Sequence, residues 1–210
     1  MKSIVVGLGL CALGSSLTAQ TENPPTARDI VKDDADWKML EQGEVVLLVD
    51  VNEKVSKQDR GNPAFYPTGA ILINSPVENV WNLINDKEAA PDYVQSLVRC
   101  RIVGKGAAHM MVEQEMKMNG LPGTFTYIVK HVMRPFERVD FERVSGDLRD
   151  IRGSWQFVPV EENTKTLLIY SLHVDPGRFV PQGLVRKGMA KNLPKCLLGI
   201  KTQVEMAPES

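Results

Sequence analysis

Between residues 96 and 175 apolar residues alternate with polar ones, and this period of two predicts half-buried β-strands. The strands are expected at 96–105, 108–118, 123–134, 138–144, 149–160 and 164–175. Short segments rich in Gly, Pro, Asn and Asp separate them, as in β-hairpins. Consecutive strands joined by such short turns predict an antiparallel meander.

Two further apolar segments precede the meander, and both are rich in β-branched residues. Residues 44–51, EVVLLVDV, and residues 69–74, GAILIN, are each expected to form a strand. The polar segment 52–67 between them ends in prolines and predicts a turn. Residues 37–43 before the first strand read as a short helix that ends at Gly43.

The pattern changes to a helical period after residue 74. Ser75, Pro76 and Glu78 predict a helix start with a capping box, in which Ser75 and Glu78 bond each other's backbone N–H groups. The apolar face of this helix is formed by Val77, Val80, Trp81 and Ile84. A second short turn over 87–90 is expected to be capped by Asp86 and ended by Pro91.

A long amphipathic helix is expected over about 180–204, with Pro194 kinking or splitting it. Its apolar stripe comprises Val185, Met189, Leu193, Cys196, Ile200 and Val204. An antiparallel sheet followed by one such helix predicts an α+β fold, in which the helix covers one sheet face. Lys187, Lys191 and Lys195 lie on the helix's other side, either as a solvated face or as a transient contact with an anionic membrane.

The N-terminus has the pattern of a secretory signal peptide, with Lys2 before an apolar run and small residues up to Ala19. Cleavage near Ala19 predicts a secreted or periplasmic protein; an uncut anchor is the alternative. Residues 20–36 are polar and are expected to be a flexible lead-in. One domain is then expected over 37–205, with a short tail at 206–210.

The order of elements and several segments resemble the helix-grip superfamily, which includes START, Bet v 1-like, polyketide-cyclase-like and coenzyme Q-binding COQ10-type domains. The matching segments are INSPVENVWNLINDKEAAPDYVQSL, RGSWQFVPV, YSLHVDPG and LPKCLLGIK. The resemblance implies a curved antiparallel sheet wrapped around the C-terminal helix, with a cavity between them that the small helices roof. It implies a lipid, sterol, quinone or polyketide-like ligand, because members bind such molecules and a minority are cyclases or dehydratases.

The sequence contains none of the common catalytic or nucleotide-binding motifs. His109, His131 and His173 each lie on a different expected strand, so we expect no metal and no other cofactor. His173 alternates with the apolar residues of its strand, which predicts a solvent-exposed side chain. The formal net charge is −1, which argues against a nucleic-acid partner. We expect a monomer.

The candidate ligand-binding residues are those predicted to face the cavity. They are Trp81, Phe141, Arg143, Trp155, Phe157, Tyr170, Leu172, Val185 and Met189. The alternative for the aromatic members is simple core packing between sheet and helix. Arg143, close to Arg149 and Arg152, either points inward to hold an anionic head group or stays exposed.

Cys100 and Cys196 form a disulfide or, as we prefer, remain two buried thiols. We therefore expect a protein that binds a hydrophobic small molecule in an internal cavity. Transport of this molecule is a further expectation. The enzymatic alternative is a polyketide cyclase- or dehydratase-like catalyst that uses Tyr170, Arg143 or His131 for acid–base work. A partner-binding module using the edge of the first strand is a third reading.

Overall fold

The computed structural model describes residues 25–50, 63, 66–118, 123–178 and 180–207. The predicted signal peptide and the last three residues of the expected tail lie outside these ranges. Within the described residues, none of the helices combines the length and apolarity that crossing a membrane requires.

An antiparallel sheet of eight strands forms the body of the molecule, in the order β1-β2-β8-β7-β6-β5-β4-β3. The strands are β1 Val46–Val49, β2 Thr68–Ile73, β3 Leu97–Lys105, β4 His109–Met116, β5 Phe125–Arg134, β6 Arg138–Gly146, β7 Asp150–Val160 and β8 Lys165–Asp175. The predicted meander of six strands is confirmed as β3 to β8. β2 pairs with β8 in register from Thr68 opposite Ser171 to Ile73 opposite Thr166, so the first strands extend the meander beyond its last strand.

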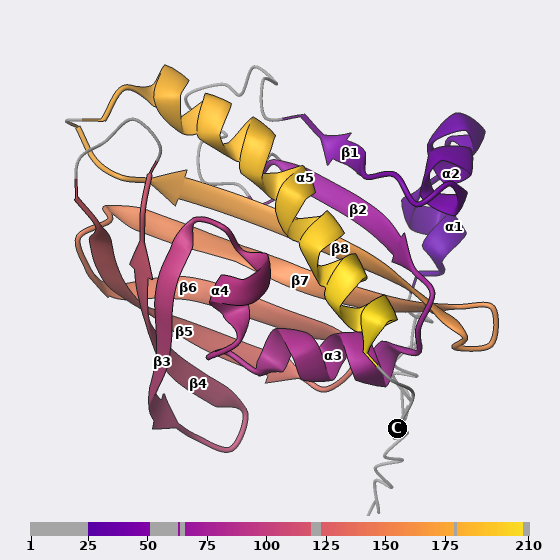
Figure 1. The fold of residues 1–210 in the computed structure, drawn as a ribbon, viewed down its shortest axis with the longest axis horizontal. Helices are drawn as coiled ribbons and strands as arrows, with labels where there is room; N and C mark the ends of the chain where they lie inside the picture. The colour runs from indigo at the N-terminus through magenta and orange to yellow at the C-terminus, as the bar shows by residue number, and fades with distance from the viewer. Residues whose placement is uncertain (1–24, 51–62, 64–65, 119–122, 179, 208–210) are drawn as a thin grey trace, which may run out of the picture.

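The helix α5, Gln182–Met206, crosses one face of this sheet, as Figure 1 shows in yellow. The predicted α+β fold with a sheet gripping a C-terminal helix is therefore confirmed. The helix is not split at Pro194, because the residues on both sides of that position are held in the core. Leu193, Cys196, Leu197 and Ile200 are all buried.

Apolar side chains fill both faces of the sheet near β2 and β8. Ile71 and Leu168 point into a large core beneath α5, whereas Leu72 and Leu167 point into a second core on the opposite face. This differs from the expectation of one buried face, and it explains the uninterrupted apolar runs at 70–73 in β2 and 167–170 in β8.

The second core is covered by α1, Ala27–Ile30, and α2, Asp34–Glu41. Thr26 caps α1 in a capping box with Asp29, and Asp33 caps α2. Part of the segment that we expected to be a flexible lead-in is therefore helical. The segment is mostly polar. Its few apolar side chains, Val31 among them, are nevertheless enough to pack it on the sheet.

The small helices α3, Val77–Asn85, and α4, Ala90–Tyr93, follow β2. The predicted capping box of α3 is wrong, because the Ser75 hydroxyl accepts instead from the Asn79 amide at 3.0 Å. Asn163, in the turn between β7 and β8, accepts from Val77 N at 3.1 Å and donates to Glu78 at 2.9 Å. Pro91 lies in the first turn of α4 instead of ending a helix, where its missing N–H costs no hydrogen bond.

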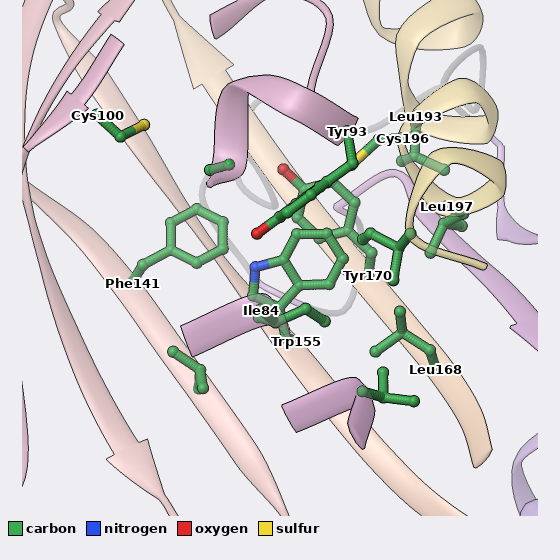
Figure 2. Packing of buried hydrophobic residues seen from close by; sticks show 14 of the residues in the cluster. Ile84, Tyr93, Cys100, Phe141, Trp155, Leu168, Tyr170, Leu193, Cys196 and Leu197 are labelled. Atoms are coloured by element: carbon green, nitrogen blue, oxygen red, sulfur yellow. The ribbon is translucent and has the colours of Figure 1, made fainter. Parts of the chain in front are cut away.

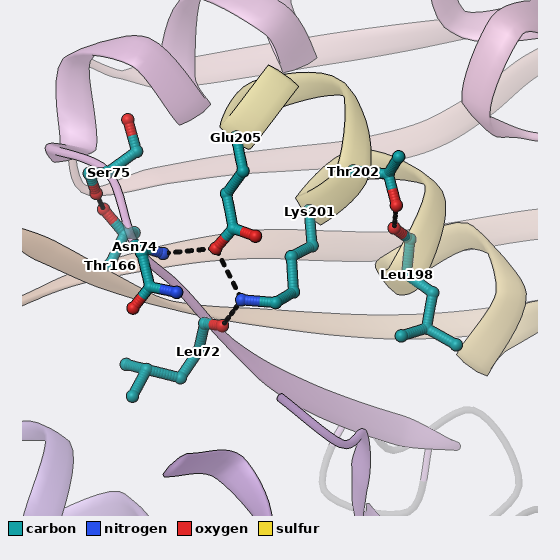
Figure 3. A network of polar contacts seen from close by, with 8 residues as sticks. All are labelled: Leu72, Asn74, Ser75, Thr166, Leu198, Lys201, Thr202 and Glu205. Carbon is teal, nitrogen blue, oxygen red and sulfur yellow. Dashed lines mark hydrogen bonds and ion pairs between the residues drawn. The ribbon is translucent and has the colours of Figure 1, made fainter. Parts of the chain in front are cut away.

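The C-terminal part of α5 is tied to β2 by polar contacts, which Figure 3 shows. Lys201 Nζ donates to the Leu72 carbonyl at 2.9 Å, and the Glu205 carboxylate accepts from Asn74 N at 2.7 Å. Gly69 lets α5 approach β2 closely, because a Cβ there would meet Leu193 at 2.4 Å. These contacts fix α5 at one end of the sheet and leave its first turns to border the cavity.

Candidate functional site

A cavity lies between the sheet, the N-terminal half of α5 and the segment from Ile84 to Leu97 that contains α4. The volume open to the centre of a water molecule is about 150 Å³. One water needs roughly 10–15 Å³ on this measure, so the space holds about ten waters or a small organic molecule. The interior between the sheet and α5 therefore contains a cavity as well as a packed core.

Six of the nine candidate residues line this cavity. They are Phe141, Trp155, Tyr170, Leu172, Val185 and Met189. They come from β6, β7, β8 and α5, and sequence alternation on the strands and the 3.6-residue period on the helix place them on the inner side. Binding of a ligand by these residues stays a prediction.

The other three candidates lie elsewhere. Trp81 packs against Phe157 with ring centroids 5.2 Å apart, and both belong to the core beneath α3. Trp81 and Phe157 therefore have the role that the alternative interpretation gave them, which was packing in the core between sheet and helix. Arg143 folds back over its hairpin turn, where it donates to the Gly146 carbonyl at 2.7 Å.

Aromatic rings make up much of the cavity wall (Figure 2). Trp155 and Tyr170 are cross-strand partners on β7 and β8, and their rings stack 3.6 Å apart. Phe141 lies 6.3 Å from Tyr170 and 5.7 Å from His131, centroid to centroid. Such ring pairs stabilise one another beyond the burial of their area, so this part of the wall is well packed.

His131 is buried in this wall with a 5% exposed surface. Neither ring nitrogen has a hydrogen-bond partner among the described residues. Burial lowers the pKa of His131 well below its usual value, and the nearby charge of Lys87 lowers it further. A neutral imidazole offers one donor and one acceptor, so His131 brings unused hydrogen-bonding capacity to the cavity.

Lys87 is the lining residue that sequence reasoning missed most clearly. It follows α3 in the polar stretch NDKEAA, where a lysine reads as solvated, yet only 3% of its surface is exposed. Its Nζ donates to the Ile84 carbonyl at 2.9 Å. Burial lowers the pKa of Lys87 to about 7. No sequence signal would have found it, since its burial depends on how the segment between α3 and α4 packs along the cavity.

The buried thiols and phenols in and beside the cavity wall are neutral at pH 7. Burial raises the pKa of Cys196 to about 12 and, for Cys100 beside the cavity, to about 11. Burial likewise raises the pKa values of Tyr93, Tyr127 and Tyr170 above their usual value. Cys100 and Cys196 are both free thiols.

Two of the three enzymatic candidates, His131 and Tyr170, line the same cavity, whereas Arg143 does not. His173 is on the other face of the sheet and is half-buried, because Tyr66 stacks on it with centroids 5.2 Å apart. The predicted placement of His173 on the other sheet face is therefore confirmed, but its side chain is half-buried and not exposed as expected. Among the described residues, no three His, Cys, Asp or Glu side chains gather in a way that could hold a metal ion.

A sheet that grips a C-terminal helix around an apolar cavity defines this protein as a helix-grip protein. Residues 73–198, more than half of the chain, match the family described as polyketide cyclase / dehydrase and lipid transport. The chain belongs to this family, which confirms the resemblance to the START-containing superfamily.

Individual relatives are distant. The ribosome association toxin RatA of Vibrio cholerae is 24% identical over 91 residues, which are 43% of this chain and 62% of RatA. The STAR-related lipid transfer protein of Xanthomonas axonopodis superposes with a TM-score of 0.62 at 12% identity, over 77% of this chain and 93% of that one. The Zhui aromatase/cyclase of Streptomyces sp. R1128 gives 0.58 at 13% identity, over 66% of this chain and 92% of the other.

Proposed function

We propose that this protein binds an apolar small molecule, such as a lipid, sterol, quinone or polyketide-like compound, in the cavity beneath α5. The observation that carries the proposal is the cavity of about 150 Å³ walled by Phe141, Trp155 and Tyr170. Clefts of this kind, lined by apolar and aromatic groups with a few polar ones, are typical ligand sites. Family membership supports it, since the family description includes lipid transport.

The predicted signal peptide supports a role outside the cytoplasm. A carrier in that compartment would shield an apolar ligand from water. Lys187, Lys191 and Lys195 are exposed along α5 beside the cavity. They suit a brief contact with an anionic membrane during loading or release. This contact is an extension of the proposal, and vesicle co-sedimentation with and without anionic lipid tests it.

The binding proposal is tested by filling the cavity from α5. Gly188 lines the cavity, and a Cβ there would meet nothing within 4 Å, so Gly188→Phe should place its ring in the open space without disturbing the helix. We expect the affinity for N-phenylnaphthylamine, a neutral apolar dye that fluoresces when shielded from water, to fall by about ten-fold or more.

Gly183→Phe is the matched control. Gly183 lies on the same helix, also has no neighbour within 4 Å of a Cβ, and does not line the cavity. This variant should bind the dye like the wild type. The proposal fails if the wild type does not bind the dye, or if a folded Gly188→Phe variant binds it equally well.

A further inference from the structure

The described residues that line the cavity include two lysines and no carboxylate. Lys117 is exposed at the cavity mouth, where water screens its charge, whereas Lys87 is buried. The acidic residues next to Lys87 in the chain, Asp86 and Glu88, are exposed. The interior therefore contains a lysine for which the wall supplies no negative charge.

The donors of Lys87 are only partly used. An ammonium group has three N–H donors, and the one hydrogen bond found for Lys87 goes to the Ile84 carbonyl at 2.9 Å. His131, opposite on β5, is buried with both ring nitrogens unpartnered among the described residues. Buried polar groups are nearly always hydrogen-bonded, so two such groups facing one cavity indicate that something else completes them.

Lys87 and His131 both line the cavity, and both side chains are buried. The charge of Lys87 also lowers the pKa of His131, in addition to the larger effect of burial. Most of the remaining wall is apolar or aromatic, with Phe141, Trp155 and Tyr170 among its residues. The cavity thus combines the donors of two buried groups with a largely apolar wall.

We propose that the cavity takes an apolar molecule with one carboxylate head group, which Lys87 binds as its counter-ion and to which His131 donates a hydrogen bond. This inference rests on the proposed function, because it names the class of ligand for the same cavity. A carboxylate accepts about four hydrogen bonds and bears the negative charge that the wall lacks. The apolar part of the molecule would then lie against the aromatic rings.

Binding should also change the protonation of Lys87. Besides the exposed Lys117, the other titratable groups in or beside the cavity wall are buried: Cys100 on β3, Tyr93 on α4, Tyr127 and His131 on β5, Tyr170 on β8 and Cys196 on α5. Burial keeps all of them neutral near pH 7, so none competes for the ammonium. A bound carboxylate raises the pKa of Lys87 from about 7, and the complex therefore takes up protons between pH 7 and 9.

The test compares dodecanoate with dodecanol, which share an alkyl chain and differ in the head group. Isothermal titration calorimetry at pH 8, in two buffers with different ionisation enthalpies, gives both the affinity and the number of protons taken up. We expect Lys87→Met to weaken dodecanoate binding by about ten- to hundred-fold, the loss of a charge-assisted hydrogen bond, and to leave dodecanol binding nearly unchanged. Proton uptake with dodecanoate should appear in the wild type and vanish in Lys87→Met.

Lys38→Met removes an exposed lysine of α2 that does not line the cavity and should match the wild type in every measurement. If neither compound binds, both this inference and the proposed function are wrong. If both bind with equal affinity and no protons are taken up, only the carboxylate assignment is overturned. The same holds if Lys117→Met, rather than Lys87→Met, removes the preference for dodecanoate. Proton uptake is measured on the wild type, so the result does not depend on the folding of any variant.

Discussion

At the scale of single residues, the burial of Lys87 affects the stability of the whole fold. An ammonium group transferred from water to an apolar cavity loses its hydration, so the folded protein favours the neutral amine. The unfolded chain has the ordinary lysine pKa near 10.5, whereas the folded chain has a pKa of about 7. Between these values the unfolded state binds more protons, and the stability of the empty protein rises with pH.

We predict that the free energy of unfolding increases from pH 7 to pH 9, with a slope from Lys87 of at most about 1.4 kcal/mol per pH unit. Above pH 9 the raised pKa values of Cys100 and Cys196 act in the opposite direction, because the unfolded thiols ionise first. Lys87→Met should be more stable than the wild type at pH 7 and should lose this slope. Urea unfolding across this pH range measures both.

Lys38→Met again serves as the control and should keep the wild-type slope. A Lys87→Met variant with an unchanged slope would show that Lys87 is solvated in the folded state. That result would also remove the support that its burial gives to a carboxylate ligand.

At the scale of elements, the start of α3 depends on a turn that is distant in the chain. Asn163 adopts a φ of +65°, a left-handed conformation that Asn tolerates better than most residues. In this position its amide bonds both Val77 N and the Glu78 carboxylate, and it lowers the pKa of Glu78. One side chain thus caps the helix and fastens the β7–β8 turn to it.

We predict that Asn163→Ala lowers the free energy of unfolding by about 1–2 kcal/mol, as the loss of an N-cap does elsewhere. Asn163→Gly removes the same hydrogen bonds but tolerates the positive φ, so it should be less harmful than Asn163→Ala. Thermal and urea unfolding of the two variants separates the stability lost with the capping hydrogen bonds from the stability lost through the unfavourable positive φ of alanine. Equal stability of Asn163→Ala and the wild type would mean that water caps α3 just as well.

At the scale of the whole molecule, the sheet is sandwiched near β2 and β8 between α5 on one face and α1 with α2 on the other. Trp37 and Leu40 of α2 pack over Ala70, Leu72, Leu167 and Ile169. Without the helices these strand residues would face water. The second core therefore supports the strands on which α5 rests, even though it lies away from the cavity.

We predict that a chain beginning at Gly43 is at least about 4 kcal/mol less stable than one beginning at Pro25. The estimate follows from re-exposing several apolar side chains at roughly 1.5–3 kcal/mol each. The shorter chain should also aggregate, which light scattering detects. Equal unfolding midpoints for the two chains would show that α1 and α2 are dispensable.

Local patterns predicted much of the fold because they depend on short-range geometry. The alternation in β3 to β8 and the stripe on α5 report which faces are apolar, and both elements appear where these patterns place them. The same alternation placed Phe141, Trp155 and Tyr170 on the inner side of the sheet. Neither this alternation nor the helical period could separate the cavity wall from the solid core, so Phe157 and Trp81 were assigned to the wrong part of the interior.

Periodicity within single segments was enough to place the antiparallel meander, the C-terminal helix and six residues of the cavity wall. The family was indicated by the resemblance of four separate segments and of the order of elements. The three-dimensional packing was needed to show that Asn163 caps α3, that α1 and α2 build a second core, and that Lys87 and His131 face one cavity. These features arise between segments far apart in the chain, where burial and pairing depend on which surfaces the fold brings together.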